Sequence, residues 1–280
     1  MVKHTPRLIL PSNGRAHGWK PDTPDVFAPR LSRKIDTALT ATIRNPSLNK
    51  EWYAPIGDQG DLGSCTGWGT RAAMYLKFKE KHGEKISGKW GEEWDLSPLA
   101  IYWLGRRREN CIPYDEGCEI KDVVEEAAKF GAPTEATWPY EISKFTREPS
   151  VKAFKEGLWH QAVGSYRCDE RGAPTEQTLN NMLLALQNGF PIVLGFTCYS
   201  NLWEADGNGV VPSPKGRVEG GHCITIYGAD TDSRYFWGPN SWSNEWGGTP
   251  PGGGERGYIY LPFAGVENGW IDDCHAVDIE

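Results

Sequence analysis

The chain has 280 residues, 39% of them hydrophobic, which is enough for a sizeable core in one large domain or two closely packed lobes. Its net charge of −7 and isoelectric point of about 5.5 argue against a nucleic-acid-binding surface. No apolar run approaches the length of a membrane span, and the N-terminal MVKHTPRLIL lacks a signal-peptide core. We therefore expect no nucleic-acid or membrane partner, and a protein that is cytoplasmic or exported by a non-classical route.

Residues 1–50 form a basic N-terminal arm, with nine Lys and Arg residues against three Asp residues. The arm therefore carries +6, and residues 51–280 carry the remaining −13. It is rich in Pro and only weakly periodic, so we expect an extended segment with one short helix near Leu31–Arg44. Such an arm is either a pro-segment or a structural extension, and it is either solvated or docked on the acidic body.

Helical signals dominate the next part of the chain, the predicted helical lobe of residues 51–160. A helix is predicted to begin near Cys65 and to end at Gly83. Ser97, followed by Pro, is a typical N-cap for a second helix. The apolar spacing in GCEIKDVVEEAAKF predicts a third helix, which ends at Gly131.

The remainder, residues 161–280, is predicted to be a mainly β lobe with one helix from Thr175 to Gly189. Short β-rich runs, separated by Gly and Pro, follow that helix. They lie at residues 191–196, 222–228, 234–242 and 257–262, with a glycine-rich loop at 247–257.

The seven cysteines are an odd number, so at least one thiol is unpaired. No CxxC or CxxH spacing indicates a zinc site, and no metal is expected. Without a secretion signal most of the thiols are expected to be reduced. The short separation of Cys111 and Cys118 makes that pair the best candidate for a disulfide.

Cys65 lies in GDQGDLGSCTGWGT (residues 57–70), where a glycine-rich loop becomes a helix. The first amides of a helix lack partners and form the positive end of its dipole. They stabilise a thiolate, which lowers the pKa of the thiol, and they can bind a developing oxyanion. The position therefore favours a nucleophile, although most single cysteines are small buried hydrophobes.

A nucleophilic thiol needs a base, and His222 in EGGHCITIYGAD is the best placed of six histidines. It opens a predicted strand directly after two glycines, which leave its side chain accessible. Asn240 follows at the end of the next β-type run, where its amide oxygen can orient the imidazole. Trp242 lies two residues further on and can shield that hydrogen bond from water. The alternative is a structural histidine followed by an ordinary turn.

Together these residues resemble the papain family of cysteine peptidases. Cys65 stands in a Gly-Ser-Cys context, His222 follows 157 residues later, and Asn240 lies 18 residues beyond that, in the order of the family. Asn240-Ser241-Trp242 resembles the family's Asn-Ser-Trp signature, and Gln59 stands where the family keeps its oxyanion-hole glutamine. The resemblance covers about residues 51–265 and is closest to prokaryotic-type members. GWKPDTPD in the arm also resembles a segment common ahead of those domains.

The resemblance implies an α+β, papain-like two-lobed fold: a helical lobe, an antiparallel β-barrel-like lobe, and an active-site cleft between them. It implies that a Cys65 thiolate attacks a peptide or protein substrate with His222 as its imidazolium partner. Asn240 would orient the imidazole, and Gln59 and the Cys65 backbone amide would hold the oxyanion. The resemblance implies no cofactor.

The chain also departs from the family pattern. Leu62 stands where secreted members have a disulfide-forming cysteine, and Thr66 stands where an aromatic residue is usual. The family's long inhibitory pro-segment is not expected in the arm. Gly117 resembles the glycine that pairs with the substrate backbone, and Gly221 is expected to face the substrate as well. Leu194–Phe196 are expected to line part of the specificity pocket.

Three alternatives remain at this point. An acyl-transfer enzyme, such as a peptide ligase or amidase, can use the same machinery. A catalytically silent binding module can have the same fold. The third is a peptidase that its own basic arm inhibits. The sequence assigns neither a side-chain preference nor an oligomeric state.

Overall fold

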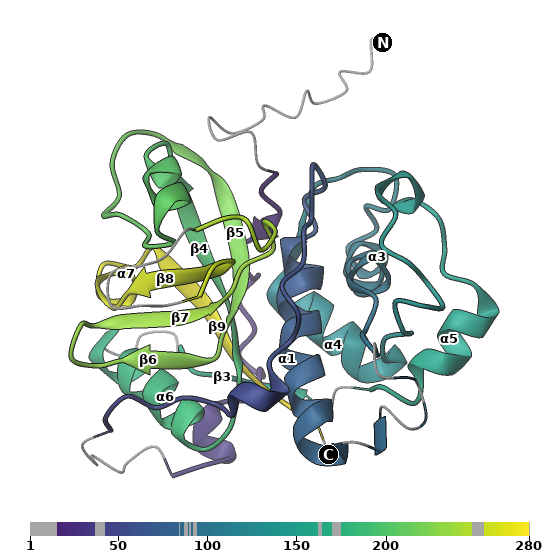
Figure 1. Ribbon diagram of the computed structural model, residues 1–280, viewed down its shortest axis with the longest axis horizontal. Coiled ribbons are helices and arrows are strands. Elements are labelled where there is room, and N and C mark those ends of the chain that lie inside the picture. The colour runs from purple at the N-terminus through teal and green to yellow at the C-terminus, as the bar shows by residue number, and fades with distance from the viewer. Residues whose placement is uncertain are drawn as a thin grey trace.

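The computed structural model describes residues 16–36, 43–83, 85–86, 89, 91, 94–161, 164–169, 175–247 and 255–279. Its elements form two lobes, one of helices and one of antiparallel sheets (Figure 1). The long helix α1 (Cys65–His82) lies where the two lobes meet. This is the two-lobed α+β arrangement that the sequence predicted.

Capping residues set the helix ends in the helical lobe. At the start of one helix the Ser97 hydroxyl accepts a hydrogen bond from the backbone N–H of Ala100 at 3.2 Å. Gly83 and Gly131 end two helices with φ of +49° and +65°, a backbone region that favours glycine. These three predicted helix ends are confirmed. Beside α1, the lobe contains α3 (Pro98–Arg108), α4 (Ile120–Phe130), α5 (Val151–Gly157) and the 3-10 turn η3 (Ile142–Lys144). A further 3-10 turn, η2 (Lys50–Trp52), contacts α1.

Helix α1 is buried along most of its length because it packs on both lobes. It contacts α3 on one side and the strands β4 (Ile192–Tyr199) and β5 (Val218–Ile226) on the other. A Cβ atom at Gly67 would lie 2.5 Å from the carbonyl oxygen of Pro98, and one at Gly69 would lie 3.0 Å from the sulfur of Cys223. Glycine at these two positions therefore lets the helix approach both lobes closely.

Two antiparallel sheets form the β lobe. The first has the strand order β3-β9-β4-β5 and the second has the order β6-β7-β8. Helix α6 begins at Thr175, as predicted, and lies in the β lobe (Figure 1). The further elements of this lobe are β3 (Gly164–Arg167), α6 (Thr175–Gln187), η4 (Leu202–Gly207), β6 (Gly228–Asp230), β7 (Tyr235–Pro239), β8 (Tyr258–Pro262), α7 (Ala264–Glu267) and β9 (Ile271–Asp278).

Four of these strands, β4, β5, β7 and β8, confirm the predicted β-type runs, whereas β3 and β9 were not predicted. One detail of the prediction is wrong, because His222 lies in the middle of β5 and not at its start. The two glycines before it belong to the strand: Gly220 pairs with Cys198, and Gly221 pairs with Thr197 of β4.

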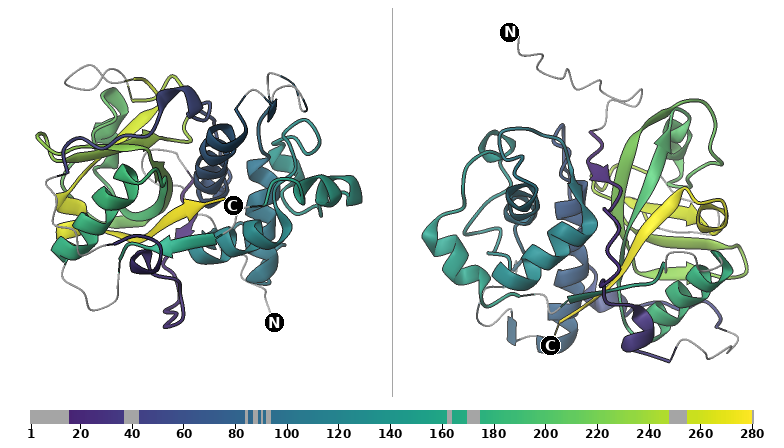
Figure 2. Two further views of the ribbon diagram at one scale, coloured as in Figure 1. Left: turned by 90° about the horizontal axis from the view of Figure 1, so that it is seen from below. Right: turned by 180° about the vertical axis from the view of Figure 1, so that it is seen from behind.

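The first described part of the arm, which contains strand β1 (Trp19–Lys20), runs along the junction of the two lobes, as the right-hand view of Figure 2 shows. The part just before residue 50 lies on the β lobe, where Ser47 pairs with Gly228. Strand β1 pairs in parallel with β2 (Cys118–Glu119) of the helical lobe. Of the helix expected near residues 31–44, the structure describes one 3-10 turn, η1 (Leu31–Arg33). Residues 37–42 and the centre of the predicted glycine-rich loop, residues 248–254, lie outside the described residues.

All seven cysteines are free thiols. The disulfide predicted between Cys111 and Cys118 is therefore wrong. Among the residues that the structure describes, no helix combines the length and the apolar character needed to cross a membrane.

Candidate active site

The predicted nucleophile, Cys65, is the first residue of α1 and is completely buried. Its sulfur interacts with backbone groups of Cys223, Gly18 and Thr66 by hydrogen bonds. Cys223 directly follows His222 on β5, so the site draws its predicted nucleophile and base from elements on either side of the lobe junction.

Burial raises the pKa of the Cys65 thiol to about 12, although backbone hydrogen bonds from Cys223, Gly18 and Thr66 lower it in part. The expected lowering of this pKa by the helix terminus is therefore not found in this state. The reason is that the sulfur is enclosed by backbone of the β lobe, of α1 and of the arm, which together exclude the solvent that a thiolate needs. In this state the thiol is protonated at neutral pH.

The predicted base and its orienting residue form a hydrogen-bonded pair. Nε2 of His222 lies 2.8 Å from Oδ1 of Asn240, and both side chains are buried. The same Oδ1 accepts a hydrogen bond from the backbone N–H of Ser241 at 2.8 Å. Because Oδ1 can only accept, the proton of the neutral imidazole lies on Nε2, which leaves Nδ1 to exchange a proton with a thiol. The ring of Trp242 stacks on His222 with 4.5 Å between the ring centroids, and Trp242 is itself completely buried.

Gln59, the predicted oxyanion-hole residue, is buried and held at both ends of its amide. Its Oε1 accepts a hydrogen bond from the hydroxyl of Ser241 at 2.6 Å. Its Nε2 donates to the carbonyl oxygen of Leu62 at 2.9 Å and to that of Ala16 at 3.0 Å. The amide predicted to bind a substrate carbonyl therefore binds a carbonyl of the arm.

Residues 16–20 of the arm, called here the inserted segment, occupy the space around these side chains. The backbone N–H of Cys118 donates to the carbonyl oxygen of Gly18 at 2.8 Å. A Cβ atom at Gly117 would lie 2.0 Å from that oxygen, and one at Gly221 would lie 2.4 Å from Cε3 of Trp19. Both glycines that were predicted to face the substrate thus face the inserted segment.

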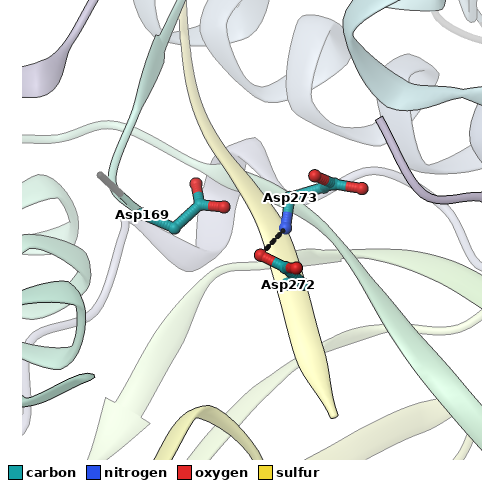
Figure 3. Close-up of side chains that lie close together, drawn as sticks. All are labelled: Asp169, Asp272 and Asp273. Carbon is teal, nitrogen blue, oxygen red and sulfur yellow. Dashed lines mark hydrogen bonds between the residues drawn. The ribbon is translucent and has the colours of Figure 1, made fainter. Parts of the chain in front are cut away.

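Sequence reasoning missed the residues that hold the inserted segment in place. The carboxylate of Asp273 accepts hydrogen bonds from Nε1 of Trp19 at 3.2 Å and from the backbone N–H of Asp22 at 2.7 Å. The carboxylate of Asp22 in turn accepts from Arg167 at 2.9 Å and from His275 at 2.7 Å. The only sequence signal for these contacts was the resemblance of GWKPDTPD to a segment common ahead of such domains. Asp273 was missed because it lies in β9 (Figure 3), whose polar residues kept it from being predicted as a strand.

Comparisons with known proteins agree with this geometry. The family described as papain family cysteine protease matches residues 43–264. An uncharacterized peptidase C1-like protein, L477 of Acanthamoeba polyphaga mimivirus, is 29% identical over 260 residues, which cover 87% of this chain and 79% of that protein. Cathepsin B-like CP3 of Giardia intestinalis is 26% identical over 211 residues, covering 69% of this chain and 61% of that protein.

Solved structures share the fold. Xylellain, a cysteine protease from Xylella fastidiosa, superimposes with a TM-score of 0.75 at 24% identity, covering 95% of this chain and 96% of that one. Bromelain from Ananas comosus, in complex with the E64 inhibitor, has a TM-score of 0.55 at 18% identity, with 82% and 95% of the two chains covered. Since the family match spans most of the chain and the fold agrees with it, the chain belongs to the papain family of cysteine peptidases.

Proposed function

We propose that Cys65 is the nucleophile of this peptidase and that His222 is its proton-transfer partner. The observation that carries the assignment is the His222–Asn240 hydrogen bond of 2.8 Å. It is joined to the nucleophile by Cys223, the residue after His222, whose backbone forms a hydrogen bond with the Cys65 sulfur at the N-terminus of α1. The His222–Asn240 bond fixes the imidazole with Nε2–H toward Asn240, so that Nδ1 can exchange a proton with the thiol.

The reaction then follows from these positions. The Cys65 sulfur attacks the carbonyl carbon of the scissile peptide bond, and the oxyanion is bound by Nε2 of Gln59 and the backbone N–H of Cys65. The His222 imidazolium gives its proton to the leaving amine, and a thioester remains on Cys65. Water, deprotonated by His222, hydrolyses the thioester and restores the thiol.

The proposal includes a latent state in which the inserted segment occupies the site. Three features support it. The carbonyl oxygen of Ala16 uses the Nε2 donor of Gln59, backbone groups of Gly18 contact the sulfur, and burial holds the thiol protonated. A substrate carbonyl cannot reach Gln59 until the inserted segment leaves. In this latent state the arm inhibits the peptidase.

The test is covalent labelling with a thiol-directed peptidyl inhibitor, followed by mass mapping of the modified cysteine, together with peptide hydrolysis assays. We expect the label on Cys65 alone. We also expect Cys65→Ala to lower kcat/KM by at least about a thousandfold, because the thioester can no longer form. Cys111→Ala is the matched control, since it removes another buried free thiol and should hydrolyse peptides at the wild-type rate. Equal hydrolysis by Cys65→Ala and the wild type would refute the assignment.

A further inference from the structure

The two donors of the proposed oxyanion hole lie at opposite ends of one short loop. One donor is Nε2 of Gln59, and the other is the backbone N–H of Cys65, the first residue of α1. Residues 60–64 between them form a turn, without helix or strand. An oxyanion hole works only when both donors are held within hydrogen-bond distance of the position that the oxyanion takes. Contacts from outside the loop are therefore needed to fix its two ends relative to each other.

One hydroxyl group joins the two ends of this loop. Oη of Tyr140 donates a hydrogen bond to the backbone carbonyl oxygen of Gln59 at 2.8 Å. It also lies 2.5 Å from Oγ of Ser64, the residue directly before Cys65. Because a carbonyl oxygen can only accept, the Tyr140 proton lies toward Gln59, and the hydroxyl of Ser64 donates to Oη. The N–H of Cys65 belongs to the peptide bond that Ser64 forms, so both donors of the hole are attached to residues that bond to the same oxygen atom.

Tyr140 is itself held in place by residues of the helical lobe. Its backbone N–H donates to the carboxylate of Glu135 at 2.5 Å. Its ring packs edge-on against the indole of Trp68, which lies one turn beyond Ser64 on α1, with 4.9 Å between the ring centroids. Burial raises the pKa of Tyr140 to about 12, so its hydroxyl keeps the proton that it donates to Gln59 at neutral pH. The side chain is thus a fixed donor and not a mobile one.

The backbone of Gln59 is held from both lobes. Its N–H donates to the carbonyl oxygen of Ser241 in the β lobe at 2.8 Å, and its carbonyl oxygen accepts from Tyr140 in the helical lobe. The partners of Tyr140 named above, Gln59, Ser64, Trp68 and Glu135, all lie outside the inserted segment. We therefore expect the hydroxyl to hold the loop in the same way after the inserted segment leaves and a substrate enters.

We propose that Tyr140 is a positioning residue for the reaction: its hydroxyl holds Gln59 and Ser64 together, so that the two oxyanion donors converge on one point. Tyr140 acts through these residues and not on the substrate. Removal of its hydroxyl leaves both donors in the chain but releases the distance between them. Because loss of one whole donor costs about 10²–10³ in kcat, a partial misplacement is expected to cost about tenfold. This inference rests on the proposed function, because the donors have a role only if Cys65 attacks a carbonyl carbon.

The experiment compares two reactions of Cys65 in the full chain, wild type and Tyr140→Phe. Peptide hydrolysis forms an oxyanion, whereas alkylation by iodoacetamide forms none, because the sulfur displaces iodide from a saturated carbon. The readout is kcat/KM for a peptide divided by the rate constant for alkylation of Cys65, which mass mapping follows. Occupancy of the site by the arm, or loss of folded enzyme, lowers both rates equally and cancels, so a purely structural role would leave this quotient unchanged. We expect Tyr140→Phe to lower the quotient by about tenfold.

Tyr53→Phe is the matched control, because it removes a hydroxyl that likewise donates to a backbone carbonyl, that of Leu48 at 3.0 Å, outside the loop of residues 59–64. It should change the quotient by less than about twofold. A second comparison makes Tyr140→Phe in the Gln59→Ala background. There the further loss should shrink to about threefold or less, because one of the two donors that the hydroxyl positions is already gone.

Two results would overturn the inference. One is an unchanged quotient in Tyr140→Phe, and the other is a loss in the Gln59→Ala background as large as in the wild type. Peptide cleavage that survives Cys65→Ala would instead contradict the proposed function, so the two failures are distinguishable.

Discussion

At the scale of single residues, two opposite effects act on Cys65. The N-terminus of α1 and backbone hydrogen bonds favour the thiolate, whereas complete burial favours the thiol. Burial prevails in this structure and raises the pKa to about 12. Because the backbone of Gly18 in the inserted segment lies at the sulfur, we expect the same residue to become reactive when solvent and substrate replace the arm.

Gln59 provides the first prediction at this scale. We expect Gln59→Ala to lower kcat by about 10²–10³, with little change in KM, because in the proposed mechanism its Nε2 stabilises the oxyanion more than the ground-state carbonyl. Each rate is divided by the concentration of active sites, which is measured by titration with a thiol-directed inhibitor. This correction is needed because the substitution also removes the hydrogen bond from Gln59 to Ala16 and so changes the fraction of molecules whose site the arm occupies.

Ser241→Ala is the control for that substitution. It removes the hydroxyl that holds Oε1 of Gln59 but keeps the Nε2 donor, so the loss in kcat should stay within about tenfold. A Gln59→Ala variant with normal kcat and a raised KM would mean that the amide binds the substrate without stabilising the transition state.

At the scale of elements, local sequence signals explain most of the helices and several of the strands of the β lobe. Ser97 and the glycines 83 and 131 mark helix ends through side-chain capping and positive φ, which are local properties of the chain. The β-rich runs that form β4, β7 and β8 could also be predicted, because the composition of a short run is likewise a local property of the chain.

Strand β9 could not be predicted, because its sequence IDDCHAVD has neither an apolar run nor a regular alternation. The strand is nevertheless almost entirely buried, since it lies between β3 and β4 and its polar residues are paired. Asp273 bonds to Trp19 and Arg167, and His275 bonds to Asp22. Long-range partners thus stabilise a strand that local propensity disfavours, and Asp273 was missed with it.

The arm is the element whose removal from the site is simplest to test. A Cβ atom at Gly18 would lie 1.7 Å from the carbonyl oxygen of Gly63, so Gly18→Ala cannot keep the inserted segment in its present position. The substitution changes no other part of the proposed site. We expect Gly18→Ala to be labelled at Cys65 by a peptidyl inhibitor at least about tenfold faster than the wild type, and to hydrolyse peptides faster by a similar factor.

Phe27→Ala is the control, because it changes a strongly exposed side chain of the arm outside the inserted segment. It should leave the labelling rate at the wild-type value. If Gly18→Ala is folded but is labelled no faster than the wild type, the inserted segment does not limit access to Cys65 and the latent state is wrong.

At the scale of the whole molecule, the site joins parts of the chain that no local pattern connects. The order of Cys65, His222 and Asn240 was readable, because each has a recognisable local context. The contacts of the arm could not be predicted from local context, because their partners are far apart in the sequence. Gln59 lies 43 residues from Ala16, and Asp273 lies 254 residues from Trp19. Such pairs depend on how the two lobes close, and this is why the sequence left the role of the arm open.

Several titratable groups face the inserted segment, and their pKa shifts determine how docking depends on pH. Burial lowers the pKa of His17 from 6.5 to about 4, although Glu219 of β5 opposes this, and the ring of His222 lies 6.3 Å away between centroids. Burial alone would raise the pKa of Asp22, but hydrogen bonds from His275 and other donors lower it overall. Burial and the charge of Asp22 raise the pKa of Asp273.

The signs follow from which state binds the proton more tightly. The undocked His17 binds a proton more tightly than the docked one, so docking weakens as pH falls from 6.5 to 4, by up to about tenfold per pH unit. Asp22 acts in the same direction, because its lowered pKa makes docking favourable only while it is ionised. Asp273 acts in the opposite direction, but it keeps Arg167 as a partner in both states.

The expected outcome is that acidification from pH 6.5 to 4 releases the arm. The measurement is the labelling rate of Cys65 in the wild type divided by that in Gly18→Ala at each pH, which cancels the intrinsic pH dependence of the thiol. This ratio should rise as pH falls and level off near 4, where the docked His17 is itself protonated. The variant His17→Phe keeps an aromatic ring beside Trp242 but has no group that titrates at this position. The ratio of labelling rates should therefore rise less in this variant than in the wild type. A ratio that stays constant across this range would show that protonation of these groups does not control the arm.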